Sequence, residues 1–345
     1  AAVRAEQVPD SRAKEGLPVA VGGSSDGRGV ICAANYEARK FGVRSALATA
    51  VALRKCPQLT MLTPDMAKYA AESKIIQSIF YQFTDIVEPL SLDEAYLDVS
   101  SSKLFQGSAS ILAHEIRKRI FEQTQLTASA GIASNKFLAK VASDWNKPNG
   151  QFVVTPDMVD VFVHKLKVEK IWGVGKVTAE KIHKLNIHTC GELQRLSLLE
   201  LTKNFGSFGH SLYEMSRGID HREVSMSTER KSLSIERTFR EDLQSIEECL
   251  GRIPELFEAF LRRAKGKEKL LEGAKTLFVK IKFNDFKSTT IERSFNSLHP
   301  EHFAELLQKG FARSRLPVRL LGMGVRFKSE KKLKANSSQL LLFEN

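Results

Sequence analysis

The sequence has few cysteines and no long apolar run. Its four cysteines (Cys32, Cys56, Cys190 and Cys249) are far apart and form no CxxC spacing, which argues against a disulfide framework or a zinc site. No segment approaches the roughly 18 apolar residues that a membrane span needs. The amino end is polar and lacks the apolar core of a signal peptide. We therefore expect a cytoplasmic protein with no membrane partner.

The charge balance is strongly basic. The 345 residues include 52 Lys and Arg against 40 Asp and Glu, a net charge of +12 and a pI near 9.5. The stretch from Lys231 to Lys334 holds 23 basic and 14 acidic residues, so it supplies +9 of the +12. Such a region favours a polyanionic partner, because each cation placed at a phosphate releases condensed counterions. Charge alone fits a nucleic-acid-binding protein and an ordinary basic protein about equally well.

The pattern of elements predicts several domains, since 345 residues are too many for one compact core. Strands and helices alternate up to about residue 155, as in an α+β domain. Residues 156–228 are mostly helical. A polar linker then leads to a module of β-α-β-β-α-β order. Its expected strands are 232–239, 276–283, 288–295 and 318–327, and its expected helices are 245–265 and 301–313.

Two adjacent carboxylates, Asp93 and Glu94, stand where a strand begins inside the otherwise apolar hairpin IVEPLSLDEAYLDVS. Carboxylates there are costly unless they bind cations or lie in water. One interpretation is a magnesium site, in which two ions about 4 Å apart act on phosphate chemistry. Judged by the dipeptide alone, an exposed acidic turn is the better interpretation.

Three longer passages favour the magnesium site over the exposed acidic turn. SLDEAYLDVS, from Ser91 to Ser100, resembles the palm signature of the Y-family DNA polymerases. NYEARKFGVRS (residues 35–45) resembles their fingers helix, and ASDWNKPNG (residues 142–150) their palm lysine motif. The resemblance runs over essentially the whole chain, in the family's order and spacing. It implies a template-directed, low-fidelity DNA polymerase for lesion bypass, without proofreading, that uses two magnesium ions to add deoxynucleotides to a primer 3′-hydroxyl.

The same resemblance implies a right-hand α+β multidomain architecture. The expected parts are small fingers, a ferredoxin-like palm, a helical thumb with a helix-hairpin-helix, a β-α-β-β-α-β little finger and a tail. Their expected residues are 1–65 for the fingers, 66–155 for the palm, 156–228 for the thumb, 231–328 for the little finger and 329–345 for the tail.

The resemblance also assigns roles to single residues. Asp93 and Glu94 would be metal ligands, and Glu94 would in addition be catalytic, near the primer 3′-hydroxyl. Tyr36, Arg39 and Lys147 would hold the triphosphate of the incoming nucleotide. These side chains suit that role, because a tyrosine hydroxyl and an arginine fork bind phosphate oxygens while lysine adds compact charge. Each residue taken singly could equally be an ordinary surface residue.

Two further motifs concern partners. Gly173 and Gly175, in KIWGVGKVTAEKIHKL, resemble a helix-hairpin-helix whose backbone amides face DNA phosphates, although ordinary helix turns also use such glycines. Near the carboxyl end, an apolar segment anchored by a glutamine fits the peptide that docks into the bacterial sliding clamp. Its residues are Gln339, Leu340, Leu342 and Phe343. The expected partners are primer–template DNA, deoxynucleoside triphosphates and this clamp, bound by a monomer.

The amino end departs from the family pattern. The family begins with a strand of the form D-x-D-x-F-F/Y-A-x-V-E, whereas Ala1-Ala2-Val3-Arg4 looks like the end of that motif. The sequence therefore lacks the first metal-binding aspartate and the aromatic steric gate. We expect a trimmed amino end and an inactive chain as it stands. The alternatives are a non-catalytic DNA- and clamp-binding scaffold, and a helix-hairpin-helix repair enzyme, which would leave NYEARKFG unexplained.

Overall fold

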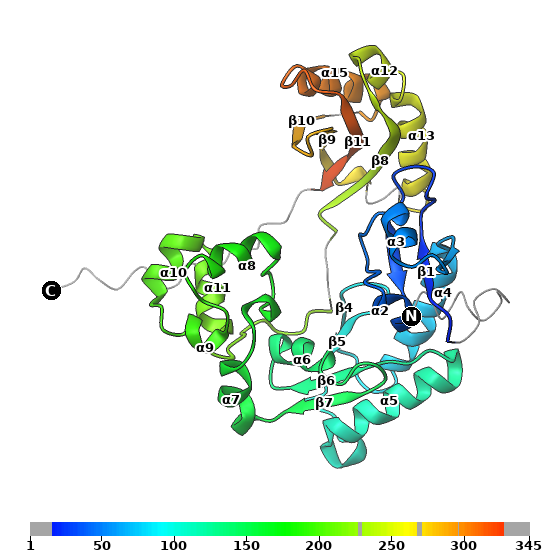
Figure 1. The fold of residues 1–345 in the computed structure, drawn as a ribbon. Helices are drawn as coiled ribbons and strands as arrows, with labels where there is room; N and C mark the ends of the chain where they lie inside the picture. Colours follow the sequence, from blue (N-terminus) through cyan, green and yellow to red (C-terminus); the bar gives the residue numbers. More distant parts are fainter. Residues whose placement is uncertain (1–15, 227–229, 268–270, 296, 328–345) are drawn as a thin grey trace. The chain divides into compact units, whose positions relative to one another are not determined.

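The structure is a computed structural model that describes residues 16–226, 230–267, 271–295 and 297–327 (Figure 1). The chain divides into two compact units. The first consists of residues 1–23, 31–47 and 51–228, and the remaining residues belong to the second. The expected fingers, palm and thumb thus fall mainly in the first unit, and their exact limits stay predictions. Residues 1–15 and the expected tail lie outside the described residues.

A three-stranded sheet begins the first unit. Its central strand, β1 (Val19–Gly22), is antiparallel to β2 (Ile31–Ala34) and parallel to β3 (Thr60–Leu62). All four residues of β1 are buried, which is typical of a strand covered on both faces. Helices α2 (Tyr36–Lys40) and α3 (Thr49–Lys55) follow β2 along the chain. The helix expected within NYEARKFGVRS (residues 35–45) is confirmed by α2.

Two long helices, α4 (Met66–Phe80) and α5 (Ala109–Thr124), pack against each other in the next part of this unit. Their contact is apolar, because each helix presents aliphatic and aromatic side chains at helical spacing. The buried side chains of this cluster are Ile79, Phe83, Leu112, Ile116, Ile120 and Leu126.

Two strand pairs accompany these helices. Strands β4 (Val87–Pro89) and β5 (Ala95–Leu97) form an antiparallel hairpin. Strands β6 (Ala130–Ala133) and β7 (Gln151–Val154) run parallel, joined through helix α6 (Lys136–Ser143). A side chain at Gly131 would place its Cβ 1.9 Å from the carbonyl oxygen of Ala139, so only glycine lets α6 lie this close to β6. In the described part of the chain these pairs are separate ladders.

The rest of the first unit is helical, as expected. Two of its helices begin with capping boxes, Thr189 with Glu192 and Ser197 with Glu200, in which each N-cap hydroxyl and glutamate satisfy backbone amides reciprocally. The helices are α7 (Val159–His164), α8 (Lys176–His183), α9 (Cys190–Leu193), α10 (Leu198–Phe205) and α11 (Phe208–Met215). Short 3₁₀ turns cover Leu104–Gly107, Pro156–Met158 and Val168–Lys170. No helix in the described ranges is long and apolar enough to cross a membrane.

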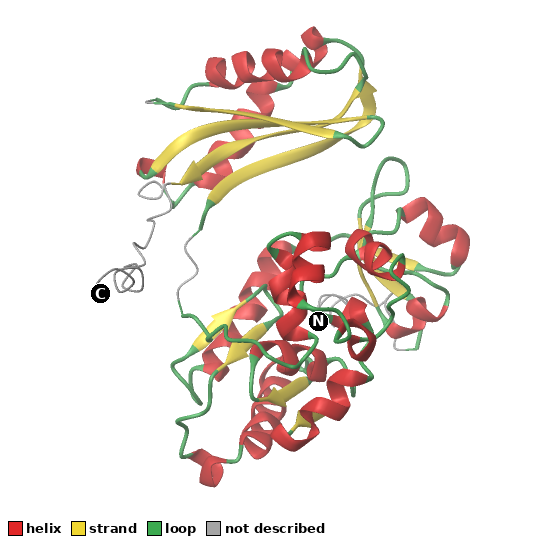
Figure 2. Cartoon of the chain, turned by 90° about the vertical axis from the view of Figure 1, so that its left-hand side faces the viewer, coloured by secondary structure: helices red, strands yellow, loops and turns green. Residues whose placement is uncertain are grey.

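The second unit is a four-stranded antiparallel sheet with helices packed on it (Figure 2). The strand order is β10-β9-β11-β8, which confirms the expected β-α-β-β-α-β sequence of elements. The strands are β8 (Ser232–Leu243), β9 (Ala274–Phe283), β10 (Ser288–Ser294) and β11 (Val318–Phe327), and the helices are α12 (Ile246–Leu250), α13 (Ile253–Ala264) and α15 (Pro300–Phe311).

One expectation for this unit is wrong. The single helix expected over residues 245–265 is two helices, α12 and α13, separated at Gly251 and Arg252. Gly251 is the C-cap of α12, and Pro254 stands in the first turn of α13. Proline has no N–H to donate and fits only the first turn of a helix, so the chain restarts there.

Candidate active site and nucleic-acid interface

The acidic pair lies on the turn of the β4–β5 hairpin. Asp93 and Glu94 are both exposed. The turn is tight, because the backbone N–H groups of Leu90 and Ser91 both donate to the carbonyl oxygen of Glu94, at 2.9 and 3.3 Å. The Ser91 hydroxyl also donates to Asp93 Oδ1 at 2.8 Å. The hairpin expected from the sequence is therefore confirmed, and its turn presents two neighbouring carboxylates.

A lysine of the neighbouring helix contacts this pair. Lys140 of α6 places its Nζ 3.1 Å from Glu94 Oε1. The site thus accommodates a cation beside Glu94. Carboxylate oxygens are the donors that magnesium prefers, so Asp93 and Glu94 fit a hard divalent cation. The described residues contain no group of three or more His, Cys, Asp or Glu side chains arranged to hold a metal ion. Asp93 and Glu94 would accordingly supply only part of a ligand set.

The two expected phosphate contacts near β2 are brought together on α2. Asn35 caps this helix by accepting from the N–H of Ala38 at 3.0 Å. Tyr36 and Arg39 are exposed one turn apart, with the Arg39 guanidinium carbon 5.6 Å from the centroid of the Tyr36 ring. The Arg39 Nε donates to the carbonyl oxygen of Ala34 at 3.0 Å, which fixes the direction of the guanidinium.

Lys147 lies on the loop between α6 and β7. Its Nζ is 2.6 Å from Asp144 Oδ1, and the Nζ of Lys170 is 3.9 Å from the other oxygen of the same carboxylate. Among the described residues, no hydrogen bond or ion pair joins Lys147 to Tyr36 or Arg39, or any of these three to the acidic pair. The structure therefore places the α2 pair, Lys147 and the acidic pair on exposed surfaces. That they act together at one site remains a prediction.

The two glycines of the expected helix-hairpin-helix differ in what they require. Gly173 has a φ of +88°, and a Cβ there would lie 2.9 Å from the Phe208 ring. Gly175, the N-cap of α8, has a φ of −87°, and a Cβ there would meet nothing within 4 Å. The fold therefore explains glycine at 173 but not at 175, where the space is open to an approaching partner. Lys181 and Phe205 line the adjoining surface hollow.

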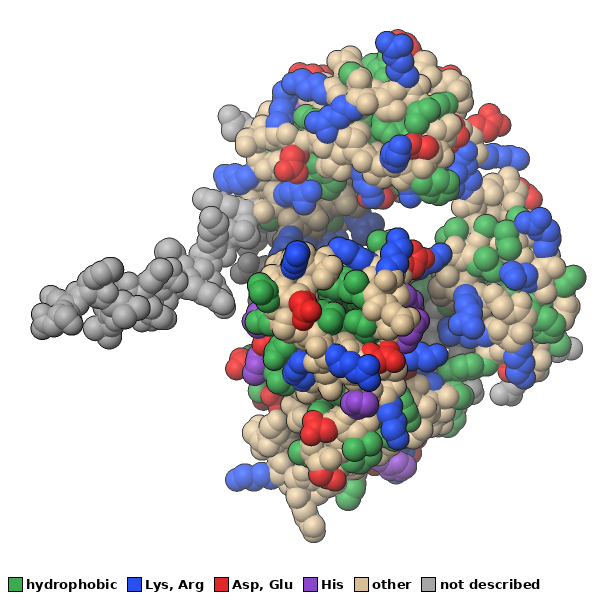
Figure 3. Space-filling view, turned by 60° about the vertical axis from the view of Figure 1, so that its left-hand side comes forward, with side chains coloured by type: hydrophobic (Ala, Val, Ile, Leu, Met, Phe, Trp, Pro, Cys, Tyr) green, Lys and Arg blue, Asp and Glu red, His purple; other side chains and the backbone are tan. Residues whose placement is uncertain are grey.

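The second unit exposes basic side chains. Lys and Arg are spread over its visible face with fewer acidic residues between them (Figure 3). At the turn between β9 and β10, the exposed ring of Phe286 lies 4.9 Å from Lys282 Nζ and 4.7 Å from the guanidinium carbon of Arg319. Interleaved cations and an aromatic ring are typical of nucleic-acid-binding surfaces. The expected clamp-binding residues lie outside the described part of the chain.

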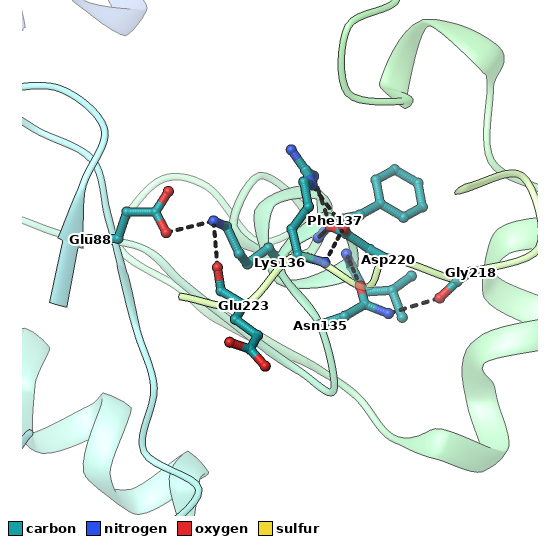
Figure 4. Close-up of polar contacts among 9 residues, drawn as sticks. Glu88, Asn135, Lys136, Phe137, Gly218, Asp220 and Glu223 are labelled. Carbon is teal, nitrogen blue, oxygen red and sulfur yellow. Dashed lines mark hydrogen bonds and ion pairs between the residues drawn. The ribbon is translucent and has the colours of Figure 1, made fainter. Parts of the chain in front are cut away.

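Sequence reasoning missed a buried charged cluster beside the acidic hairpin (Figure 4). Glu88 of β4 and Lys136 of α6 form an ion pair at 2.5 Å. Burial would raise the pKa of Glu88, but hydrogen bonds from Lys136 and from the N–H of Ser225 outweigh burial and lower it. The available signal was a glutamate within the apolar run IVEPL and a lysine between Asn135 and Phe137.

Sequence comparisons cover nearly the whole chain. The profile of the impB/mucB/samB family matches residues 2–144, that of the DNA polymerase-iota thumb domain matches 169–220, and that of the impB/mucB/samB C-terminal domain matches 230–339. DNA polymerase IV of Ectopseudomonas mendocina is 49% identical over 94% of the chain and 92% of that protein. DNA polymerase IV of Legionella pneumophila (strain Corby) is 52% identical over 91% of the chain and 88% of that protein.

The fold gives the same answer. A solved Y-family DNA polymerase chimera of Dbh and Dpo4 superimposes with a TM-score of 0.84 at 25% identity, covering 94% of this chain and 95% of that one. The architecture predicted from the motifs, with palm, thumb and C-terminal little finger, is thereby confirmed. Sequence identity near one half over more than nine tenths of the chain shows membership of the same family and not only a shared fold. The chain belongs to the Y family of DNA polymerases, together with DNA polymerase IV.

Proposed function

We propose that the turn carrying Asp93 and Glu94 is the metal-binding centre of a DNA-directed DNA polymerase for lesion bypass. The observation that carries the proposal is the pair of exposed carboxylates on a tight hairpin turn, with a cation already beside Glu94. Exposed neighbouring carboxylates of this kind are repulsive unless cations neutralise them. Loss of primer extension on replacing either carboxylate is the test.

The reaction joins a primer 3′-hydroxyl to the α-phosphorus of a deoxynucleoside triphosphate. A phosphorus–oxygen bond forms to the 3′-oxygen, the bond between the α-phosphorus and its bridging oxygen breaks, pyrophosphate leaves, and the hydroxyl proton passes to water. Two bound magnesium ions would supply Lewis-acid stabilisation of the attacking and leaving oxygens. Asp93 and Glu94 would hold these ions beside the primer end, and Glu94 would be the carboxylate nearest the 3′-hydroxyl.

Three side chains would bind the triphosphate. Tyr36 and Arg39 lie on one turn of α2, and Lys147 lies on the loop after α6. All three are exposed, so a phosphate can reach them without displacing the core. Lys147 would exchange its ion pair with Asp144 for a phosphate oxygen. The bound nucleotide would then be held by one hydroxyl and two cations.

Duplex DNA would be held without reading its sequence. The amide groups beside Gly175, at the start of α8, would face a phosphate of the backbone. The basic second unit would contact further phosphates. We take residues 1–65, 66–155, 156–228 and 231–328 as the fingers, palm, thumb and little finger of a monomer acting in the cytoplasm. The comparisons with DNA polymerase IV do not support the expectation of an inactive chain.

The assignment of Gly175 to a DNA-binding helix-hairpin-helix predicts a substitution that affects DNA affinity more than stability. Gly175→Ala should lower the melting temperature only slightly, because its φ is ordinary and its Cβ would meet no atom, although alanine is a poorer N-cap than glycine. It should weaken primer–template binding about 3- to 30-fold, since a methyl group would then stand where the phosphate approaches and weaken a charge-assisted hydrogen bond. Fluorescence anisotropy with labelled DNA measures the affinity, and calorimetry measures the stability.

Gly173→Ala and Gly206→Ala are the controls for stability, because they show how much an alanine costs where the backbone requires glycine. Both positions have positive φ, at +88° and +61°, so alanine is strained at each by about 1–3 kcal/mol. Only at Gly173 would the new Cβ also collide with Phe208, so Gly173→Ala should be the less stable variant. A Gly175→Ala protein with parental DNA affinity would contradict the hairpin assignment.

The tail would tether the enzyme to a bacterial sliding clamp. Leu342 and Phe343 would be the apolar anchors, with Leu340 beside them and Gln339 fixing the register. We expect Phe343→Ala to remove clamp stimulation of primer extension, because tethering replaces repeated encounters by an intramolecular event at roughly millimolar effective concentration. Synthesis on a bare primer should be unchanged. Primer extension with and without loaded clamp is the measurement.

Deletion of residues 339–345 provides the second arm of this test. It should reproduce the Phe343→Ala result, since the motif lies after β11, the last strand among the described residues. Clamp stimulation that persists in both variants would place the main clamp contact elsewhere. Synthesis that collapses on a bare primer would make the tail part of the fold.

A further inference from the structure

The buried ion pair between Glu88 and Lys136 joins two elements that flank the acidic turn. Glu88 belongs to β4 and Lys136 is the first residue of α6. Their side chains are only 11% and 10% exposed, and Lys136 Nζ is 2.5 Å from Glu88 Oε2. A buried pair is tolerated only where further hydrogen bonds satisfy both groups, because taking two charges out of water is costly. The segment that donates and accepts those hydrogen bonds is therefore the segment that this ion pair fastens.

Both hydrogen bonds come from the segment that leaves the thumb, residues 218–225. Figure 4 shows the contact of Lys136 with Glu223. Lys136 Nζ donates to the carbonyl oxygen of Glu223 at 3.1 Å. The N–H of Ser225 donates to Glu88 Oε2 at 2.8 Å. Each member of the ion pair thus holds one backbone group of this segment, which we name the exit segment.

A second attachment fixes the exit segment to the start of α6. Asn135 Nδ2 donates to the carbonyl oxygen of Gly218 at 2.8 Å, and the N–H of Phe137 donates to Asp220 Oδ2 at 3.0 Å. The Asp220 side chain is 2% exposed and also accepts from Arg222 at 2.8 and 2.7 Å. The exit segment therefore crosses the first turn of α6 and is held at both ends of the crossing.

The same two elements carry the acidic turn. In the β4–β5 ladder Glu88 is paired with Tyr96, two residues after Glu94, and Lys136 Nζ lies 5.0 Å from the Tyr96 ring centroid. One turn further along α6, Lys140 contacts Glu94. A displacement of α6 relative to β4 would consequently move both the acidic turn and the cation beside it.

We propose that Glu88 and Lys136 are positioning residues, which fasten the exit segment to the base of the acidic hairpin so that the thumb's last residues and the acidic turn keep one geometry. The proposal rests on the proposed function of Asp93 and Glu94. Through this pair, the chain that leads to the second unit is fixed to the palm up to Ser225. Glu88 and Lys136 touch no reacting atom and act through the elements that they join.

Hydrogen exchange of the metal-free protein tests the attachment without relying on activity. In Lys136→Met, exchange of the amides of residues 221–226, measured by mass spectrometry, should rise at least about tenfold, because the Glu223 carbonyl loses its donor and Glu88 is left buried without its partner. Exchange of α5 amides should be unchanged. Lys118→Met, which removes an exposed lysine whose ion pairs within the described part of the chain are with Glu115 and Glu122, is the matched control and should leave both readouts at parental values.

Steady-state kinetics tests the positioning role. We expect Lys136→Met to lower kcat of primer extension about 10- to 100-fold, since small misplacements of catalytic groups have effects of that size. The KM for the nucleotide should stay within about twofold, because Tyr36, Arg39 and Lys147 are not part of the cluster. A role confined to stability would lower the melting temperature and leave kcat of the folded protein unchanged.

Glu88→Gln, and the double variant that combines Glu88→Gln with Lys136→Met, keep the test decisive if Lys136→Met alone does not fold. The double variant buries no unpaired charge, so it should be more stable than Lys136→Met while its kcat stays low. Parental exchange at residues 221–226 together with parental kcat, in whichever variant folds, would overturn the proposal. Primer extension that survives loss of Asp93 would instead refute the proposed metal centre and leave the exchange result standing.

Discussion

Asp93→Ala and Glu94→Ala should each reduce magnesium-dependent primer extension by at least about 1000-fold, while primer–template DNA is still bound. The loss is expected to be large because metal-bound oxygens carry the charge that develops as the phosphoryl group is transferred. The DNA affinity should survive because both carboxylates lie on an exposed turn and support no core contact. Single-turnover extension of a labelled primer, with saturating nucleotide, measures the rate.

The matched control is Glu122→Ala, which removes one exposed carboxylate from α5 together with its ion pair to Lys118, as Glu94→Ala removes the ion pair to Lys140. It should extend primers at the parental rate. Because Lys140 contacts Glu94 but no oxygen of Asp93 in the described contacts, Glu94→Ala should also remove the ion pair of Lys140, whereas Asp93→Ala should not. Extension within about tenfold of the parent in both acidic variants would remove the metal assignment.

The local parts of this site could be predicted because short-range rules determine them. Ala95, Leu97 and Val99 alternate with polar side chains, which predicts a half-buried strand after the acidic pair, and β5 (Ala95–Leu97) begins there. The spacing of Tyr36 and Arg39 placed them one turn apart on a helix, where the structure has them. The short motif of β4, turn and β5 thus contained enough information to fix the geometry of its own turn.

Contacts between distant segments could not be predicted in this way. Glu88 and Lys136 are 48 residues apart, and nothing in either local pattern shows that they meet. The exit segment is a further 87 residues from Lys136 at its Glu223 contact. Such contacts depend on how α6 packs on β6, which follows from the close approach at Gly131. The break between α12 and α13 is different, because its cause is local: Gly251 caps α12, and Pro254 fits only the first turn of the next helix.

Arg39→Ala and Lys147→Ala should each lower kcat/KM for the incoming nucleotide about 10- to 150-fold, because a charge-assisted phosphate contact contributes about 1.5–3 kcal/mol. The double variant should lose roughly 100- to 20,000-fold, since the two residues lie on different elements and do not contact each other among the described residues, so their effects should add in free energy. DNA affinity should stay within about threefold. Steady-state kinetics with varied nucleotide, at saturating primer–template, gives both constants.

Two further variants make this assignment specific. Lys40→Ala removes an exposed cation next to Arg39 on the same helix and should leave the nucleotide dependence unchanged. Asp144→Asn should act in the opposite direction to Lys147→Ala, because Asp144 competes with the triphosphate for the Lys147 ammonium at 2.6 Å. An exposed ion pair of this kind contributes about 0–1 kcal/mol, so the KM for the nucleotide should fall by no more than about fivefold. If Lys147→Ala instead weakened DNA binding and left the nucleotide dependence unchanged, Lys147 would belong to the template side of the site, and Asp144→Asn would then change DNA affinity rather than KM.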